Sequence, residues 1–247
     1  MPPPLLAVRN LTIRFGGITA LSDVSFDVAE GHITGLIGPN GAGKTTCFNC
    51  ITRLYQPSAG EVLFKGEDLL RCPPQQVARR RIARTFQNVA LFDHMTTLEN
   101  VLVGGHSRFP GVLGAWRHER SAHAEAMEIL ERLELASFAS RPVRGLPFGT
   151  RKNIELARAL MAKPELLLLD EPAAGLGHEE VATLGTAVKR IAEEFAVTVL
   201  MVEHHMQLVM RVSDHIVVLA SGRTLADGPP DAVQRNPAVI EAYLGGV

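Results

Sequence analysis

Residues 38–45 read G-P-N-G-A-G-K-T and fit the pattern G-x-x-x-x-G-K-[ST] at every fixed position. Glycines let a backbone pass close to phosphate oxygens and aim its N–H groups at them, and a helix beginning at the loop adds its positive dipole end. Lys44 supplies a mobile charge for the β- and γ-phosphates, and the hydroxyl of Thr45 can bind Mg²⁺. The pattern therefore predicts a loop that holds a nucleoside triphosphate with Mg²⁺. The predicted nucleotide-binding residues are Gly38, Pro39, Asn40, Gly41, Ala42, Gly43, Lys44, Thr45 and Thr46.

Strand and helix patterns alternate along the chain. Short apolar runs predict strands at residues 5–8, 11–15, 24–28, 33–37, 60–64, 166–169, 197–202 and 215–219. Helices are predicted at residues 46–54, directly after the phosphate loop, and between Val181 and Phe195, where apolar residues recur every three or four positions. This alternation argues for an α/β fold with a mainly parallel sheet covered by helices.

Two other regions are predicted to be helical. From Pro73 onward the pattern is helical and charged, and residues 88–145 lack strong strand signals. Apolar residues between 126 and 133 follow the i, i+3, i+4, i+7 spacing of an amphipathic helix, so we expect a mostly helical insert. Residues 229–247 predict two short helices separated at Asn236-Pro237.

A phosphate loop needs a second strand that carries a carboxylate to the metal. The four leucines at 166–169 predict a strand buried on both faces, and Asp170 follows at its carboxyl end. If Asp170 holds Mg²⁺, directly or through water, Glu171 is left to polarise an attacking water. The alternative is an ordinary strand end followed by an acidic turn.

Together these segments resemble the ATP-binding-cassette ATPases, the motor subunits of membrane transporters, over essentially the whole chain. The resemblance implies ATP as the nucleotide and a P-loop NTPase (RecA-like) core with a mainly parallel sheet, an N-terminal antiparallel β subdomain and a small helical subdomain. It also implies a single domain over residues 1–247. In that domain, 1–87 and 146–247 form the nucleotide-binding core with its β subdomain, and 88–145 form the helical subdomain.

The resemblance gives roles to three further positions. Residues 84–87, R-T-F-Q, match the glutamine loop, which implies that Gln87 senses Mg²⁺ or the attacking water and couples to the membrane subunit. Residues 202–204, V-E-H, match the switch segment, which implies that His204 contacts the γ-phosphate. Phe15 lies where the family carries an aromatic ring that stacks on adenine, the alternative being a core residue on a strand.

The signature segment departs from the family pattern Leu-Ser-Gly-Gly-Gln, because residues 146–150 read L-P-F-G-T. In the family this stretch contacts the nucleotide of the opposite subunit through a helix N-terminus and a Ser hydroxyl, and Pro147 offers neither a hydroxyl nor an N–H. Gly149, the amides after it and the helix dipole remain as elements that can bind a nucleotide in trans. Gly177 stands where many relatives carry Asp. These changes bear on turnover and subunit coupling.

Residues 172–176 and 236–245 are similar to ATPase subunits of branched-chain amino-acid importers. That similarity implies uptake of a polar small solute such as a branched-chain amino acid. The implied partners are integral-membrane permease subunits, a second ATPase subunit in a homo- or heterodimer and, indirectly, a separate solute-binding protein. The chain is expected in the cytoplasm, peripheral on the inner face of the cell membrane. The alternatives are a soluble cassette ATPase outside transport, a regulatory cassette with weak hydrolysis, and a small-molecule kinase.

Composition argues against several other classes. The net charge of −1 gives no pull toward nucleic acid, and the basic residues at 79–81 and Arg84 are expected on a solvated helix face. No apolar run reaches 18 residues and no secretory signal is expected, so a membrane role would go through a partner. Three cysteines make no disulfide framework, which favours the cytosol, and Cys47 and Cys50 are expected to be buried packing residues.

Overall fold

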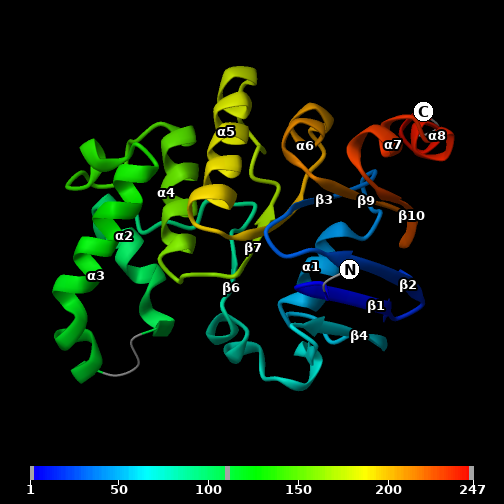
Figure 1. The fold of residues 1–247 in the computed structure, drawn as a ribbon, viewed down its shortest axis with the longest axis horizontal. Helices are drawn as coiled ribbons and strands as arrows, with labels where there is room; N and C mark the ends of the chain where they lie inside the picture. The colour runs from blue at the N-terminus through cyan, green and yellow to red at the C-terminus, as the bar shows by residue number, and fades with distance from the viewer. Residues whose placement is uncertain (1–2, 109–111, 245–247) are drawn as a thin grey trace.

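A mainly parallel sheet forms the centre of the computed structural model, which describes residues 3–108 and 112–244 (Figure 1). In this part of the chain the sheet has six strands in the order β10-β9-β3-β8-β7-β6. Their bounds are β3 (Ile33–Ile37), β6 (Ile82–Arg84), β7 (Leu166–Asp170), β8 (Thr198–Val202), β9 (His215–Ala220) and β10 (Arg223–Gly228). Strands β3, β6, β7, β8 and β9 run parallel to one another, and β10 pairs antiparallel with β9.

The central strands are apolar on both faces because both faces are covered. In β7, Leu167 and Leu169 belong to one hydrophobic cluster, whereas Leu166 and Leu168 belong to the other, as the two-residue period of a strand requires. The first cluster includes side chains of α3 (Val112–Arg132), α4 (Phe148–Leu160), α5 (His178–Glu194) and α6 (Met206–Val212). The second includes those of α1 (Lys44–Ile51) and of the second sheet. The leucine strand buried on both faces is confirmed.

A second, antiparallel sheet lies beside α1 and confirms the predicted N-terminal β subdomain (Figure 1). Its order is β2-β1-β4-β5, with bounds β1 (Leu6–Phe15), β2 (Ile18–Val28), β4 (Ala59–Phe64) and β5 (Glu67–Asp68). Residues 5–8 and 11–15, predicted as two strands, form one. The register shifts between Val8 and Leu11, and Asn10 there has a φ of 48°, so an irregularity replaces the expected break.

The predicted insert is helical and packs against α4. It contains α2 (Thr97–Gly104) and α3 (Val112–Arg132), together with the short 3₁₀ helices η4 (His106–Arg108) and η5 (Ala136–Phe138). Thr96 caps α2 by accepting the N–H of Glu99, whose carboxylate accepts the N–H of Thr96 in return. A Cβ on Gly104 would lie 1.8 Å from the Arg158 carbonyl oxygen, so α2 and α4 meet backbone to backbone.

One predicted element was wrong. The 3₁₀ turn η1 (Leu69–Arg71) precedes Pro73, and after Pro73 the chain forms the 3₁₀ turns η2 (Pro74–Gln76) and η3 (Ala78–Arg80) and then the strand β6, instead of a longer helix. Arg81 has a φ of 62° and ends the last turn. The three-residue β6 is too short to show a strand period, and it forms because Ile82 pairs with the distant Leu166.

The chain's last described elements are α7 (Pro230–Gln234) and α8 (Pro237–Leu244), which confirm the two predicted short helices up to residue 244. Cys47 and Cys50 are buried in α1, as expected of packing residues. Burial raises the pKa of the Cys50 thiol to about 11, which keeps the thiol neutral at neutral pH. Within the described part of the chain, no helix combines the length and the apolarity that crossing a bilayer demands.

Candidate active site

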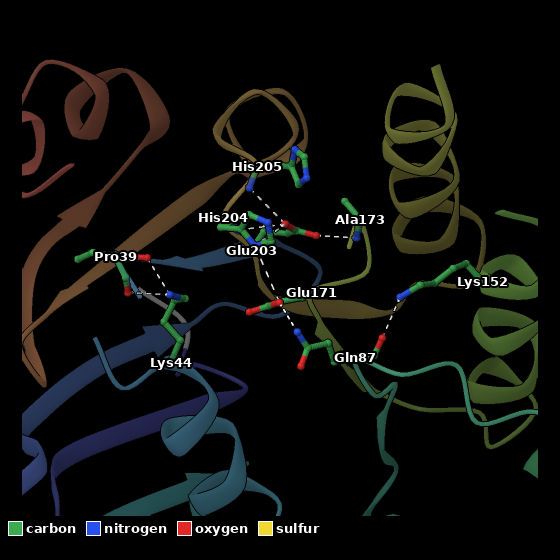
Figure 2. Close-up of polar contacts among 10 residues, drawn as sticks. Pro39, Lys44, Gln87, Lys152, Glu171, Ala173, Glu203, His204 and His205 are labelled. Carbon is green, nitrogen blue, oxygen red and sulfur yellow. Dashed lines mark hydrogen bonds and ion pairs between the residues drawn. The ribbon is translucent and has the colours of Figure 1, made fainter. Parts of the chain in front are cut away.

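The predicted site residues meet at one edge of the larger sheet, because their segments follow the carboxyl ends of neighbouring parallel strands. The phosphate loop follows β3, Gln87 follows β6, Glu171 follows β7, and His204 comes soon after β8. Figure 2 shows Gln87 and His204 converging on Glu171, with Lys44 beside them on the first turn of α1.

The backbone of the phosphate loop requires glycine at two positions. Gly38 has a φ of 149°, and a Cβ there would lie 2.0 Å from the Leu219 carbonyl oxygen. Gly43 has a φ of 102°, and its Cβ would lie 2.8 Å from the Ala20 carbonyl oxygen. The loop therefore packs tightly against the backbone of Ala20 and Leu219. A hollow of about 200 Å³ opens beside the loop. The hollow is lined by Ala20, Asn40, Gly41, Ala42, Gly43, Lys44, Thr45, Thr46 and Glu171.

Lys44 is buried, and its loop holds the ammonium group. Nζ donates to the carbonyl oxygens of Gly38 at 2.7 Å and Pro39 at 3.0 Å (Figure 2). Burial lowers the pKa of Lys44, and the negative charge of Glu171 partly opposes that shift. Two neutral carbonyls satisfy two of the three N–H donors without cancelling the charge, so this lysine can still attract an anion into the hollow.

Glu171 is the residue on which the other candidates converge. Its Oε2 accepts the side-chain N–H of Gln87 at 2.8 Å and lies 3.9 Å from Nδ1 of His204. Its backbone has a φ of 47°, in the left-handed region, and its N–H donates to the Val202 carbonyl oxygen at 2.9 Å.

Asp170 is buried and paired with a residue that the sequence analysis misplaced. Its Oδ2 accepts Nη2 of Arg84 at 2.6 Å, and the two side chains are only 6% and 8% exposed. Nη1 of Arg84 donates to Asn49 Oδ1 at 2.8 Å and Thr52 Oγ1 at 2.9 Å. The expected solvated position of Arg84 was therefore wrong. The available signal was its place directly after the apolar pair Ile82-Ala83, apart from the basic run before it.

Glu203 is a second residue that the sequence analysis did not single out. It is fully buried; its Oε1 accepts the N–H of Ala173 at 2.7 Å, and its Oε2 accepts those of His204 at 3.0 Å and His205 at 3.3 Å (Figure 2). A carboxylate that directly continues the buried apolar strand β8 was the signal that could have revealed it.

The helix α4 contacts the Gln87 segment through a buried lysine. Nζ of Lys152 donates to the Gln87 carbonyl oxygen at 3.2 Å (Figure 2). The same Nζ lies 5.6 Å from the centre of the Phe148 ring. Burial lowers the pKa of Lys152, and the charge of Glu155 opposes the shift. Glu155 accepts the N–H of Phe86 at 3.3 Å, so α4 holds this segment at two successive residues.

The amino end of α4 carries the altered signature segment. Pro147 occupies the N-cap position and provides no side-chain cap, and Gly149 lies in the first turn. A Cβ on Gly149 would lie 2.8 Å from Oε1 of Glu180, so a carboxylate of the same chain faces this helix end.

Phe15 ends β1 and is 45% exposed, so it is no core residue. Its ring packs edge-on against Tyr55, with the ring centroids 5.2 Å apart. Tyr55 thereby limits the positions that the exposed ring can adopt.

Comparison with known proteins gives consistent results. Residues 21–174 match the ABC transporter family, and residues 223–247 match the branched-chain amino acid ATP-binding cassette transporter family. The chain is 45% identical to the high-affinity branched-chain amino acid transport ATP-binding protein BraF of Pseudomonas aeruginosa and 42% identical to its counterpart LivG of Escherichia coli, with 99% of each chain covered in both cases.

Solved structures are similar as well. The ADP conformation of an ATP-binding cassette from an ABC transporter has a TM-score of 0.86 and 32% identity, with 98% of each chain covered. A dimeric bacterial ABC transporter cassette has a TM-score of 0.78 and 27% identity, covering 91% of this chain and 98% of that one.

Proposed function

This chain belongs to the ABC transporter family, and we propose that it is the ATP-hydrolysing subunit of an importer for branched-chain amino acids or a related polar solute. The relatives named above carry branched-chain amino acid transport in their names and match over nearly their full length. The match of residues 223–247 to a branched-chain amino acid cassette family supports the same solute class.

The observation that carries the proposal is the convergence on Glu171. One carboxylate oxygen lies within 2.8 Å of Gln87 Nε2 and 3.9 Å of His204 Nδ1, beside the hollow above the phosphate loop. A carboxylate in that position can orient a water toward the γ-phosphate, Gln87 can hold the water or sense the metal, and His204 can steady the γ-phosphate. A loop that only bound nucleotide would need none of these three.

The loop residues supply the binding part of the site. We propose that the N–H groups of residues 38–46 hold the phosphates, that Lys44 exchanges its two carbonyl partners for phosphate oxygens, and that Phe15 stacks on adenine. Gly149 and the first amides of α4 would contact the nucleotide of a second subunit.

The donor set fits Mg²⁺. Thr45 and Glu171 line the hollow, Asp170 precedes Glu171 at the end of β7, and Gln87 donates to Glu171. Hydroxyl, carboxylate and amide oxygens are therefore available as ligands. Mg²⁺ bound there would neutralise charge on the β- and γ-phosphates. Arg84 holds one oxygen of Asp170, which fixes the direction of the carboxylate.

The partners follow from the family. ATP-binding subunits of ABC importers work with membrane permeases and dimerise, and a related cassette forms a dimer. We propose that this chain forms such a dimer, docks on permease subunits at the inner face of the cell membrane, and serves a separate solute-binding protein indirectly. The division into a core (1–87 and 146–247) and a helical subdomain (88–145) stays part of this proposal.

A regulatory cassette with weak hydrolysis is the second candidate, and Pro147 favours it. The N-cap proline removes the hydroxyl of the family's signature segment, and Glu180 adds a negative charge at the same helix end. Turnover well above background with the permease present would exclude this candidate.

The test is Glu171→Gln, with the exposed Glu179→Gln as its matched control. We expect Glu171→Gln to keep ATP binding, to lose about 10²–10⁴-fold in turnover, and to accumulate as an ATP-bound dimer in light scattering. Glu179→Gln should behave like the natural chain. Unchanged turnover in Glu171→Gln would show that another group directs the water. Uptake of labelled leucine by vesicles carrying the co-purified permease tests the solute class.

A further inference from the structure

Glu203 joins the two loops that carry Glu171 and His204. Oε1 accepts the N–H of Ala173, two residues after Glu171, and Oε2 accepts the N–H groups of His204 and His205. Each carboxylate oxygen therefore serves a different loop, one after β7 and one after β8 (Figure 2).

The burial of Glu203 excludes direct chemistry. The residue is fully buried, so neither water nor substrate reaches its carboxylate. A carboxylate is placed in such an environment at a large desolvation cost, which only well-formed hydrogen bonds offset. Here three backbone N–H groups at 2.7, 3.0 and 3.3 Å supply them.

The contact acts on the backbone of His204 and leaves its ring available. Nδ1 of His204 lies 4.0 Å from the Glu203 carboxylate, beyond hydrogen-bond distance, and the side chain is 48% exposed. The ring therefore extends toward Glu171 and the open site from a backbone that Glu203 holds in place.

We propose that Glu203 is a positioning residue that keeps the His204 segment in register with the segment after Glu171. The role rests on the proposed ATPase function, since it concerns how two residues of that site stay at their working separation. Movement of either loop would be transmitted to the other through the shared carboxylate.

The chemistry of an amide makes Glu203→Gln the sharp test. Gln has the same shape, but only one end accepts hydrogen bonds, and its NH₂ group would face an N–H donor on one of the two loops. We expect amide exchange, followed by mass spectrometry on peptides covering 171–176 and 203–206, to quicken about tenfold or more in one of these segments. Glu155→Gln is the matched control, because it removes a buried carboxylate that serves Phe86 instead.

Kinetics separate positioning from general damage. Glu203→Gln should lower kcat about tenfold or more while the dissociation constant for ATP stays within about twofold, because Glu203 accepts its hydrogen bonds from Ala173, His204 and His205, which lie outside the phosphate loop. Unchanged exchange in both segments, together with unchanged kcat, overturns the inference.

If Glu203→Gln does not fold, amide exchange in the natural chain decides. His204 and His205 lie outside helices and strands, so only the Glu203 contact is expected to protect their amides. Exchange of these amides at the rate of an unstructured peptide overturns the inference.

The two proposals can fail separately. Faster exchange in Glu203→Gln, with a natural chain that hydrolyses no ATP, supports the positioning contact and overturns the ATPase. An active natural chain whose exchange and kcat do not respond to Glu203→Gln overturns this inference alone.

Discussion

Replacing Arg84 with Met removes one partner of a buried ion pair and keeps a side chain of similar length. The carboxylate of Asp170, 6% exposed, then loses its cation at 2.6 Å, and Asn49 and Thr52 lose their shared donor. Breaking a buried pair on one side costs about 3–5 kcal/mol, because the remaining charge stays desolvated. At about 2–4 °C per kcal/mol for a chain of this size, Tm should fall by about 6–20 °C.

Thermal and urea denaturation of the nucleotide-free protein, followed by circular dichroism, measure the loss. Arg80→Met is the matched control, since Arg80 pairs with the 67% exposed Glu67, and water screens such an exposed pair so that it contributes little to stability. Arg84→Lys should fall between the two because an ammonium group lacks the planar fork that reaches three acceptors. Equal stability of Arg84→Met and Arg80→Met would refute the reasoning and show that solvent or rearrangement compensates Asp170.

Three further substitutions test other parts of the site. Gly38→Ala would bring a Cβ within 2.0 Å of the Leu219 carbonyl oxygen, so ATP affinity measured by calorimetry should fall at least about tenfold, and near-natural affinity would contradict the packing described. Lys152→Met removes the donor to the Gln87 carbonyl oxygen, so kcat should fall several-fold with ATP affinity retained; an equal loss of both would point to general misfolding. Burial raises the pKa of Tyr243 from 10.0 to about 12, so the stability that the neutral phenol contributes is complete below pH 10 and is lost as the pH rises to 12. In alkaline denaturation, Tyr243→Phe should therefore unfold less readily than the natural chain across that window. Identical curves would contradict the shift.

Local patterns predicted the parts of the site that depend on neighbours in sequence. The glycine spacing of residues 38–45 predicted a loop whose φ angles and close contacts do require glycine at Gly38 and Gly43. The leucine run before Asp170 predicted a strand buried on both faces, because one residue in two faces each side of a sheet. The spacing near residues 126–133 predicted the buried face of α3 for the same kind of reason.

Contacts between distant segments could not be predicted in this way. The strand β6 has three residues and no period of its own, and it forms through its pairing with β7. That pairing brings Arg84 to Asp170 and Gln87 to Glu171, which lie 86 and 84 positions apart in the chain. Arg84 was assigned to a solvated face because a basic side chain near a basic run is usually exposed.

Short-range order thus accounts for the backbone of the phosphate loop and for most of the strands, since backbone geometry and burial repeat with a fixed period. Long-range order accounts for the working separation of Glu171, Gln87 and His204. That separation depends on which strands become neighbours and on two buried charged groups, Arg84 and Glu203, whose partners become visible only after the sheet has formed. A buried charge is stable only where folding supplies its partners, and no pattern along the chain records where they come from.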